Sequence, residues 1–143
     1  MNSNSSNSPL ISDLDTLVEI DMITTNETGK SVFTKVTHPL SNHGGMYISE
    51  RQQALNFRHR KSAVGYKSDW HTAGDPTLIL VMQGQITLEL RSGESKTFTS
   101  GQQFIAADYT LETADESITG HRAYVEGEID LQAVHIKLSQ RSN

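Results

Sequence analysis

The sequence of 143 residues has no cysteine, only three prolines and few aromatic side chains. The missing thiol excludes disulfides, cysteine nucleophiles and cysteine-based zinc sites. It also suits a reducing compartment, so we expect a cytoplasmic protein. No apolar run is long enough to span a membrane. The net charge of −5 leaves no basic excess for phosphate contacts, so neither nucleic acid nor an anionic membrane is an expected partner.

The N-terminal stretch MNSNSSNSPLISD is rich in serine and asparagine, and it lacks the basic start and apolar core of a signal peptide. We expect residues 1–12 to form a flexible tail and residues 13–143 to form one domain. A hydrophobic content of 35% favours a small closed or sandwiched sheet over a large helical bundle.

The rest of the chain consists of short alternating or β-branched runs separated by glycine turns, which are typical of strands. Strands are expected at 17–23, 31–37, 46–48, 54–60, 77–82, 85–90, 96–98, 103–106, 119–125 and 131–138. The best helical candidate is residues 50–54, where Ser49 and Gln52 match a weak capping box. The acidic residues 111–117 are either a solvated loop or the rim of a pocket. The pattern as a whole predicts an all-β protein with little or no helix.

Residues 65–101 carry the densest polar cluster, in which Asp69, His71 and Asp75 are spaced by two and four. If this segment is extended, the three side chains leave it on one face. Two carboxylates and an imidazole on one face of a strand predict a polar pocket.

Glycines recur at Gly65, Gly84, Gly93 and Gly101, with His71 after the first and Asp108 after the last. In this spacing the chain resembles the cupins, a family of small jelly-roll barrels. Gly65 and Gly84 match the two glycines that frame the first cupin motif, with His71 at the position of its first histidine. Gly93 and Gly101 match the glycines of the second motif, and Asp108 stands at its last position. The two motifs cover residues 65–108. Gly120-His121 is similar to a glycine-histidine pair on a later strand in a subgroup of small bacterial cupins.

The usual metal ligands of the family are mostly replaced. Ala73, Thr77 and Phe104 stand at three of the four ligand positions, so His71 alone remains. The resemblance therefore implies the jelly-roll barrel, but not the metal-dependent dioxygenase chemistry common in the family.

The resemblance places Asp108 and His121 on strands that line the same interior as His71. His71 can be a hydrogen-bonded core group, or the central member of a site with these residues. A site of mixed imidazole and carboxylate suits Zn, Mn, Fe or Ni, and His71, His121 and Asp69 are the candidate ligands, with Asp108 as an alternative to Asp69.

Without a metal, a histidine–aspartate pair can act as a general base, because the carboxylate fixes the imidazole tautomer and stabilises its charged form. We assign this catalytic role to His71 and Asp69, with Tyr66 as the acid partner and Tyr109 as its alternative.

Further ligand contacts are expected from Asp108, His121 and Phe104. Arg58 or Arg60 can clamp a carboxylate, or simply protect an exposed sheet edge. Trp70 points away from His71 on an extended strand, so it is a weak pocket candidate.

The leading hypothesis is a cupin barrel that binds a small polar organic compound and acts as an isomerase or lyase by His/Asp proton transfer. A non-catalytic ligand-binding or sensing barrel is the second hypothesis, and a metal-dependent oxygenase with relocated ligands is the third. By resemblance, the hairpin at residues 17–37 is available for pairing, which predicts a homodimer.

Overall fold

The computed structural model describes residues 16–139, so the tail expected at residues 1–12 lies outside the described residues. The described chain is built from short strands and one 3-10 turn. These elements are β1 (Leu17–Thr25), β2 (Ser31–Pro39), β3 (Ser41–His43), β4 (Met46–Ile48), β5 (Ala54–Ser62), β6 (Thr77–Gln83), β7 (Gln85–Leu90), β8 (Ser95–Thr99), β9 (Gln103–Ala106), η2 (Glu116–Ile118), β10 (His121–Tyr124) and β11 (Leu131–Leu138). No helix among residues 16–139 is long and apolar enough to cross a membrane.

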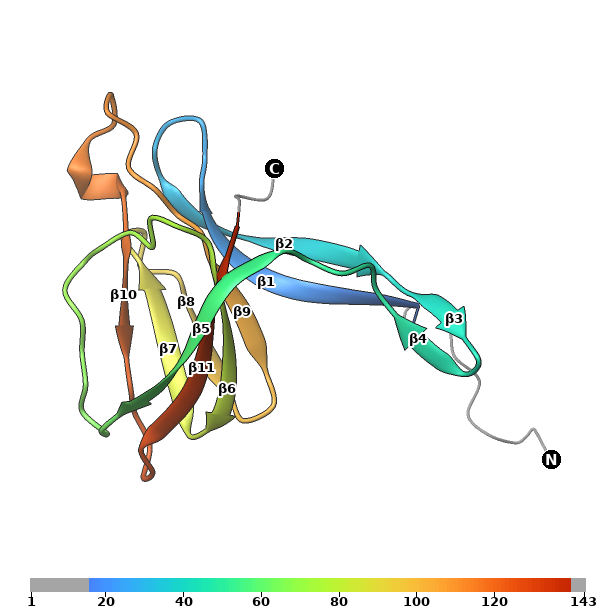
Figure 1. Ribbon diagram of the computed structural model, residues 1–143. Coiled ribbons are helices and arrows are strands. Elements are labelled where there is room, and N and C mark those ends of the chain that lie inside the picture. The colour runs from blue at the N-terminus through green and yellow to red at the C-terminus, as the bar shows by residue number, and fades with distance from the viewer. Residues whose placement is uncertain (1–15, 140–143) are drawn as a thin grey trace.

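Two facing sheets form the barrel (Figure 1). One has six strands in the order β2-β1-β9-β6-β11-β5, and the other has three in the order β10-β7-β8. The segment between β5 and β6 runs beside β10, held by isolated bridges from Lys67 to Tyr124 and from His71 to His121. The segment therefore extends the smaller sheet toward the edge formed by β5. This arrangement is an all-β jelly roll, as the sequence predicted.

The core forms where the alternating apolar residues of the two sheets face each other. On β7, Ile86, Leu88 and Leu90 are at most 2% exposed, because every second side chain of a strand points into the barrel. From the larger sheet, Phe104 meets Phe98 with ring centroids 4.6 Å apart. These side chains belong to one apolar cluster between the two sheets.

A second apolar cluster covers the outer face of the larger sheet. Its buried members are Ile20, Met22, Ile105 and Ala107. β1 and β2 continue beyond this face, and the β3–β4 hairpin extends them into an arm that projects from the barrel (Figure 1).

Most strands lie where the alternation places them, and the differences are local. Residues 41–43 pair with residues 46–48 as a hairpin instead of forming a loop. The helix considered at residues 50–54 is absent, since this segment leads directly into β5. Ser49 Oγ donates to the carbonyl of Glu50, so it caps nothing. Ala54 already pairs with Leu138 of β11, and the four residues before it are too few to form a helix with a weak cap.

The structure shows why a glycine is required at position 84. Gly84 turns β6 into β7 with a φ of +77°, and a Cβ there would lie 2.8 Å from the carbonyl oxygen of Asp130. Both the left-handed backbone and the close approach of the neighbouring chain require a residue without a side chain.

The homodimer remains a prediction, and the arm offers a way to test it. Met46 and Ile48 of the arm are 58% and 40% exposed, and apolar side chains at such a position suit a contact with a second copy.

Light scattering at micromolar concentration should give twice the mass of the chain. Met46→Ser with Ile48→Ser should shift the protein toward monomer. Met82→Ser, an equally exposed methionine at the β6–β7 turn, is the control. A wild-type monomer contradicts the prediction.

Candidate functional site

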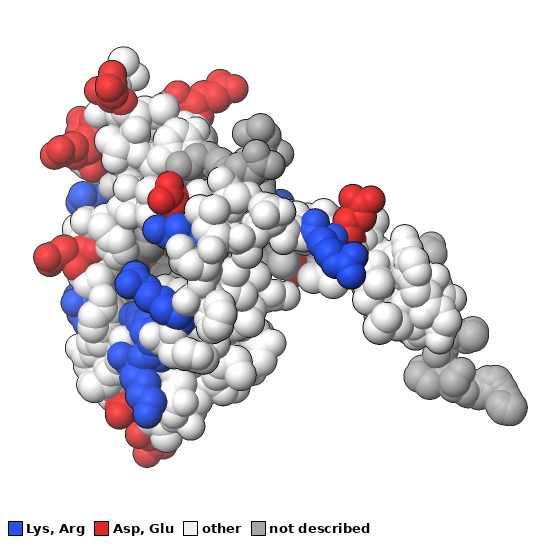
Figure 2. All heavy atoms as spheres, in the orientation of Figure 1, with Lys and Arg blue, Asp and Glu red and all other residues white. Residues whose placement is uncertain are grey.

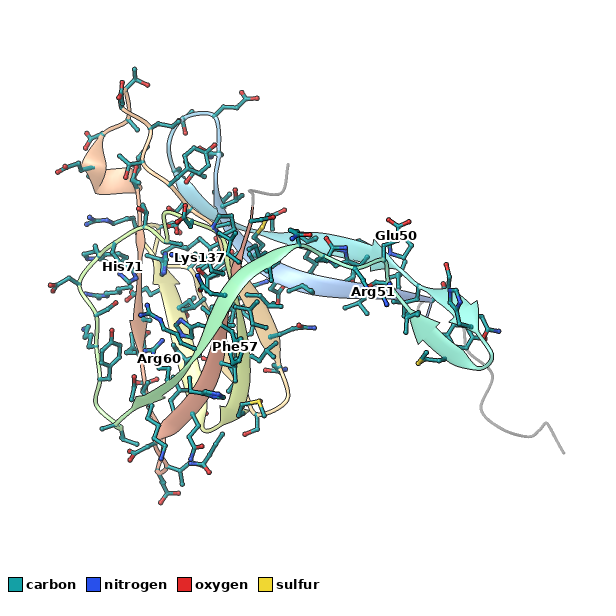
Figure 3. The ribbon with its side chains drawn as sticks, in the orientation of Figure 1. Glu50, Arg51, Phe57, Arg60, His71 and Lys137 are labelled. Carbon is teal, nitrogen blue, oxygen red and sulfur yellow. The ribbon has the colours of Figure 1, made fainter. Side chains whose placement is uncertain are left out.

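A cavity of about 250 Å³ opens between the two sheets, next to the segment that runs beside β10. Its lining combines polar groups from both sheets with an apolar floor. The lining residues are Arg58, Arg60, Tyr66, His71, Thr72, Ala73, Thr77, Ile79, Ile86, Leu88, Phe104, Ala106, His121, Ala123 and His135. In Figure 3, His71 and Arg60 lie on the barrel, whereas Glu50 and Arg51 lie out along the arm.

Behind this cavity lies a buried carboxylate. Asp108 has no exposed surface, and its Oδ2 accepts hydrogen bonds from His121 Nδ1 at 2.9 Å and from Ser31 Oγ at 2.8 Å. Its Oδ1 accepts from the main-chain N–H of Ala73 at 2.9 Å. Ser31 and Ala73 donate to this carboxyl group, and the His121 tautomer with its proton on Nδ1 completes a set of three donors around it.

The carboxylate network also fixes the start of β10. Ser31 Oγ accepts from the N–H of Gly120 at 2.8 Å while its own proton goes to Asp108. Gly120 has a φ of +98°, and a Cβ on it would lie 3.1 Å from the carbonyl oxygen of His71. A glycine at this position allows the His71 segment to approach β10 closely enough to pair with it.

His71 and His121 face each other across this pairing. Each main-chain N–H donates to the other residue's carbonyl, at 2.9 and 2.8 Å, so both side chains leave the sheet on the same face. Their ring centroids are 4.6 Å apart with the planes tilted by 51°. His121 is 4% exposed, whereas His71 is exposed at the mouth of the cavity.

Both imidazoles are oriented through Nδ1. His121 Nδ1 is bonded to the Asp108 carboxylate, and His71 Nδ1 lies 2.8 Å from the carbonyl oxygen of Asp69. Since both of these oxygens only accept, each neutral ring carries its proton on Nδ1. Nε2 of each ring then keeps its lone pair, with no hydrogen-bond partner among residues 16–139. The site therefore presents two bases.

The residues present do not fit the metal that the fold family implies. Ala73, Thr77 and Phe104, at the replaced ligand positions, all line the cavity, so its shape is kept while the donors are gone. Within residues 16–139, no three histidine, aspartate or glutamate side chains are grouped so as to hold a metal ion. A set of His71, His121 and Asp69 is therefore not assembled.

The expected role of Asp69 needs correction. Its side chain is exposed and outside the cavity, and only its carbonyl reaches His71. Asp75 is also exposed, with its carboxylate 3.6 Å from Lys137 Nζ. Residues 69–75 pair with β10 only at His71, so their side chains do not alternate as they would on a regular strand. The carboxylate that orients a histidine is instead that of Asp108.

The edge strand β5 supplies two cations to the cavity. Arg58 and Arg60 share one face of the strand, whereas Phe57 and His59 share the other, with ring centroids 5.9 Å apart. Tyr66 lines the cavity as well, and the Arg60 guanidinium lies over its ring at 5.1 Å.

His135 is a cavity residue that the sequence reasoning did not select. The alternation of Leu131, Ala133 and His135 along β11 was the available signal, because the first two are buried core residues on the same face. Burial, with added repulsion from Arg60 and Arg58, lowers the pKa of His135 to about 4. Nε2 of this ring is buried and has no hydrogen-bond partner among the described residues.

Two aromatic candidates lie elsewhere. Trp70 is on the outside of the smaller sheet, with the guanidinium carbons of Arg91 and Arg122 4.5 and 4.6 Å from its ring centroid. Tyr109 lies beside Thr25, where its N–H donates to the threonine hydroxyl at 2.8 Å. Neither residue lines the cavity.

Replacing the buried carboxylate of Asp108 should destabilise the folded protein. Asp108→Asn should lower the free energy of unfolding by about 1–3 kcal/mol, because an amide cannot accept from all three donors that the carboxylate serves. Asp75→Asn makes the same chemical change in an exposed ion pair and should cost below about 1 kcal/mol. Urea unfolding measures both changes. Equal losses would show that the Asp108 network contributes no special stability.

The lowered pKa of His135 predicts a pH dependence of stability. In the unfolded chain this histidine takes up a proton near its ordinary pKa of 6.5, whereas in the folded protein it does so only near about 4. Unfolding therefore binds a proton between these values, and stability is lost as the pH falls through this window. His135→Gln should lose less stability than the wild type over the same window, as measured by urea unfolding at stepped pH. Parallel pH profiles would contradict the prediction.

No protein-family model and no curated protein matches the sequence. Similar solved structures include a protein of unknown function from Streptococcus pyogenes, with 12% identity over 66% of this chain and 72% of that chain and a TM-score of 0.46. A cupin 2 domain-containing protein from Halorhodospira halophila has 15% identity over 73% and 78% and a TM-score of 0.46. A predicted oxalate decarboxylase from Thermotoga maritima has 17% identity over 91% and 99% and a TM-score of 0.41. The chain's own strand order shows an all-β fold of two facing sheets.

Proposed function

We propose that the barrel binds a small polar organic compound and moves a proton on it, as an isomerase or lyase does. The observation that carries the proposal is the buried Asp108–His121 pair, which leaves Nε2 of a cavity-lining imidazole as a base. A carboxylate that orients the ring and stabilises its charged form is the arrangement used in general base catalysis.

In this proposal His121 Nε2 takes a proton from the bound molecule, and Asp108 stabilises the resulting imidazolium. His121 itself, once it carries the proton, or the hydroxyl of Tyr66 at the cavity wall returns a proton to a second position; in the latter case the His121 proton passes to the Tyr66 oxygen afterwards. Return to another carbon completes an isomerisation, and protonation of a departing group completes an elimination. No step requires an oxidant or a metal ion.

The apolar floor supports such chemistry. Ile79, Ile86 and Leu88 line the cavity below the polar groups and are 6%, 1% and 2% exposed. An environment with little water strengthens the interaction between the imidazolium and the carboxylate, and it prevents water from taking up the proton.

Solvent deuterium incorporation tests this proposal without knowledge of the substrate. The protein is incubated in D₂O and a chelator with a panel of small oxo and hydroxy compounds, both acidic and neutral, and C–H exchange is followed by proton NMR. At least one compound should exchange. His121→Gln should slow that exchange by roughly 10²–10⁴-fold, the usual contribution of a general base. His43→Gln, an exposed histidine on the arm, is the matched control and should leave the rate unchanged.

Two outcomes would contradict the assignment. Equal exchange by the wild type and His121→Gln would remove His121 from the chemistry. A compound that shifts the NMR signals of His71 and His121 but takes up no deuterium would identify the barrel as a non-catalytic binding module.

A further inference from the structure

We propose that the molecule held in this cavity is a small carboxylic acid, and that Arg58 and Arg60 bind its carboxylate beside His135. The inference rests on the proposed function, since it concerns the same cavity, and it names the substrate class. The cations and the two imidazole bases come from different sheets, so the acid group and the reacting carbon would contact different walls.

The register of the larger sheet brings the three groups together. Arg58 is opposite His135 in the pairing of β5 with β11, and His135 is opposite Ile79 in the pairing of β11 with β6. Directly opposed residues of antiparallel strands share a face, so Arg58 and His135 lie in one row on the inner side. Arg60 is two residues further along β5 and shares that face.

The two guanidiniums have no carboxylate partner. The ion pairs of the described chain use other cations, and Arg122, for example, is paired with Glu89 at 2.7 Å. No aspartate or glutamate lines the cavity. The oxygens of Asp108, the nearest buried acid, are already taken by donors from the protein. The cavity therefore carries two positive charges that nothing in residues 16–139 balances.

The surroundings of Arg60 raise the energy of its charged form. Burial lowers the pKa of Arg60, although an arginine remains protonated at neutral pH. Its Nε donates to Ser62 Oγ at 2.9 Å, which fixes one edge of the guanidinium. The remaining N–H groups can bind a carboxylate through two parallel hydrogen bonds, and a bound anion would offset the cost of burying the cation.

His135 adds a donor without adding a charge. With a pKa of about 4, the ring is neutral near pH 7 and carries one N–H. The buried, unpartnered Nε2 belongs to a ring that lines the cavity together with the two arginines. When protonated at Nε2, the neutral ring can donate to a carboxylate oxygen.

The alternative for Arg58 and Arg60, protection of the sheet edge, fits the geometry less well. β5 is the edge strand, and basic side chains gather over it in Figure 2. Charges that only deter edge pairing need not line a cavity, yet both arginines do. The exposed outer face of β5 instead carries Phe57, which is 66% exposed.

The size and floor of the cavity restrict the ligand. About 250 Å³ is below the usual range of ~300–1,000 Å³ for ligand pockets, so the acid must be small. The apolar floor favours a short hydrocarbon or oxo chain over a polyhydroxylated one.

The test compares acids with their neutral amides. Acetate, propionate and pyruvate, each with its amide, are titrated into the full chain while the NMR signals of His71, His121 and His135 are followed. The acids should shift these signals, and the amides should bind at least about tenfold more weakly. Arg60→Gln and Arg58→Gln should each weaken acid binding by about tenfold or more, since each removes a charge-assisted pair of hydrogen bonds. Lys61→Gln removes the same charge from the outer face of β5 and should change binding less than about twofold.

The outcomes separate this inference from the proposed function. Amides that bind as well as acids, or acid binding that the arginine variants leave unchanged, would overturn the carboxylate assignment while keeping a functional cavity. If neither acids nor amides shift the three histidines at high millimolar concentration, the carboxylate assignment fails, and the deuterium-exchange experiment decides the proposed function separately. Arg58→Lys keeps the charge but loses the planar fork. Partial recovery of binding in this variant would support a carboxylate held by paired hydrogen bonds.

Discussion

The buried carboxylate of Asp108 is the constraint on which the rest of the site depends. A charge without exposed surface is tolerated only when donors surround it, and here the donors come from three separate segments of the chain. Ser31 begins β2, Ala73 follows the segment beside β10, and His121 begins β10. One side chain therefore joins both sheets and sets the position of the histidine that lines the cavity.

The polar groups of the cavity divide between its two walls. The smaller sheet and the segment beside it contribute His71 and His121, whose Nδ1 atoms are engaged and whose Nε2 atoms keep their lone pairs. The larger sheet contributes Arg58, Arg60 and the neutral His135. Bases on one wall and cations on the other suit an anionic molecule that loses a proton. Such a division follows from the two-sheet architecture, because each wall takes its residues from different strands.

The sequence predicted the strands and turns of this barrel well, but it predicted the polar residues of the cavity only in part. Gly84 and the alternation of β7 follow local rules, since a left-handed turn demands glycine and a half-buried strand alternates. The same alternation would have placed His135 beside Leu131 and Ala133 on the inner face of β11. Asp69 was misassigned because it lies where the chain pairs at one residue only, so the two-residue period does not hold.

The sequence by itself determined the fold class and the loss of the metal motif, because strand periodicity, turn glycines and residue identity at fixed spacings are local properties of the chain. Only the tertiary structure decided which carboxylate orients a histidine. Asp108 and His121 are 13 residues apart, and Ser31 is 77 residues from Asp108, so no local pattern could pair them. It also decided that Arg58 and Arg60 face inward without a counter-charge. The absence of an acid beside a cation depends on every strand that packs around it, and this becomes defined only when the barrel closes.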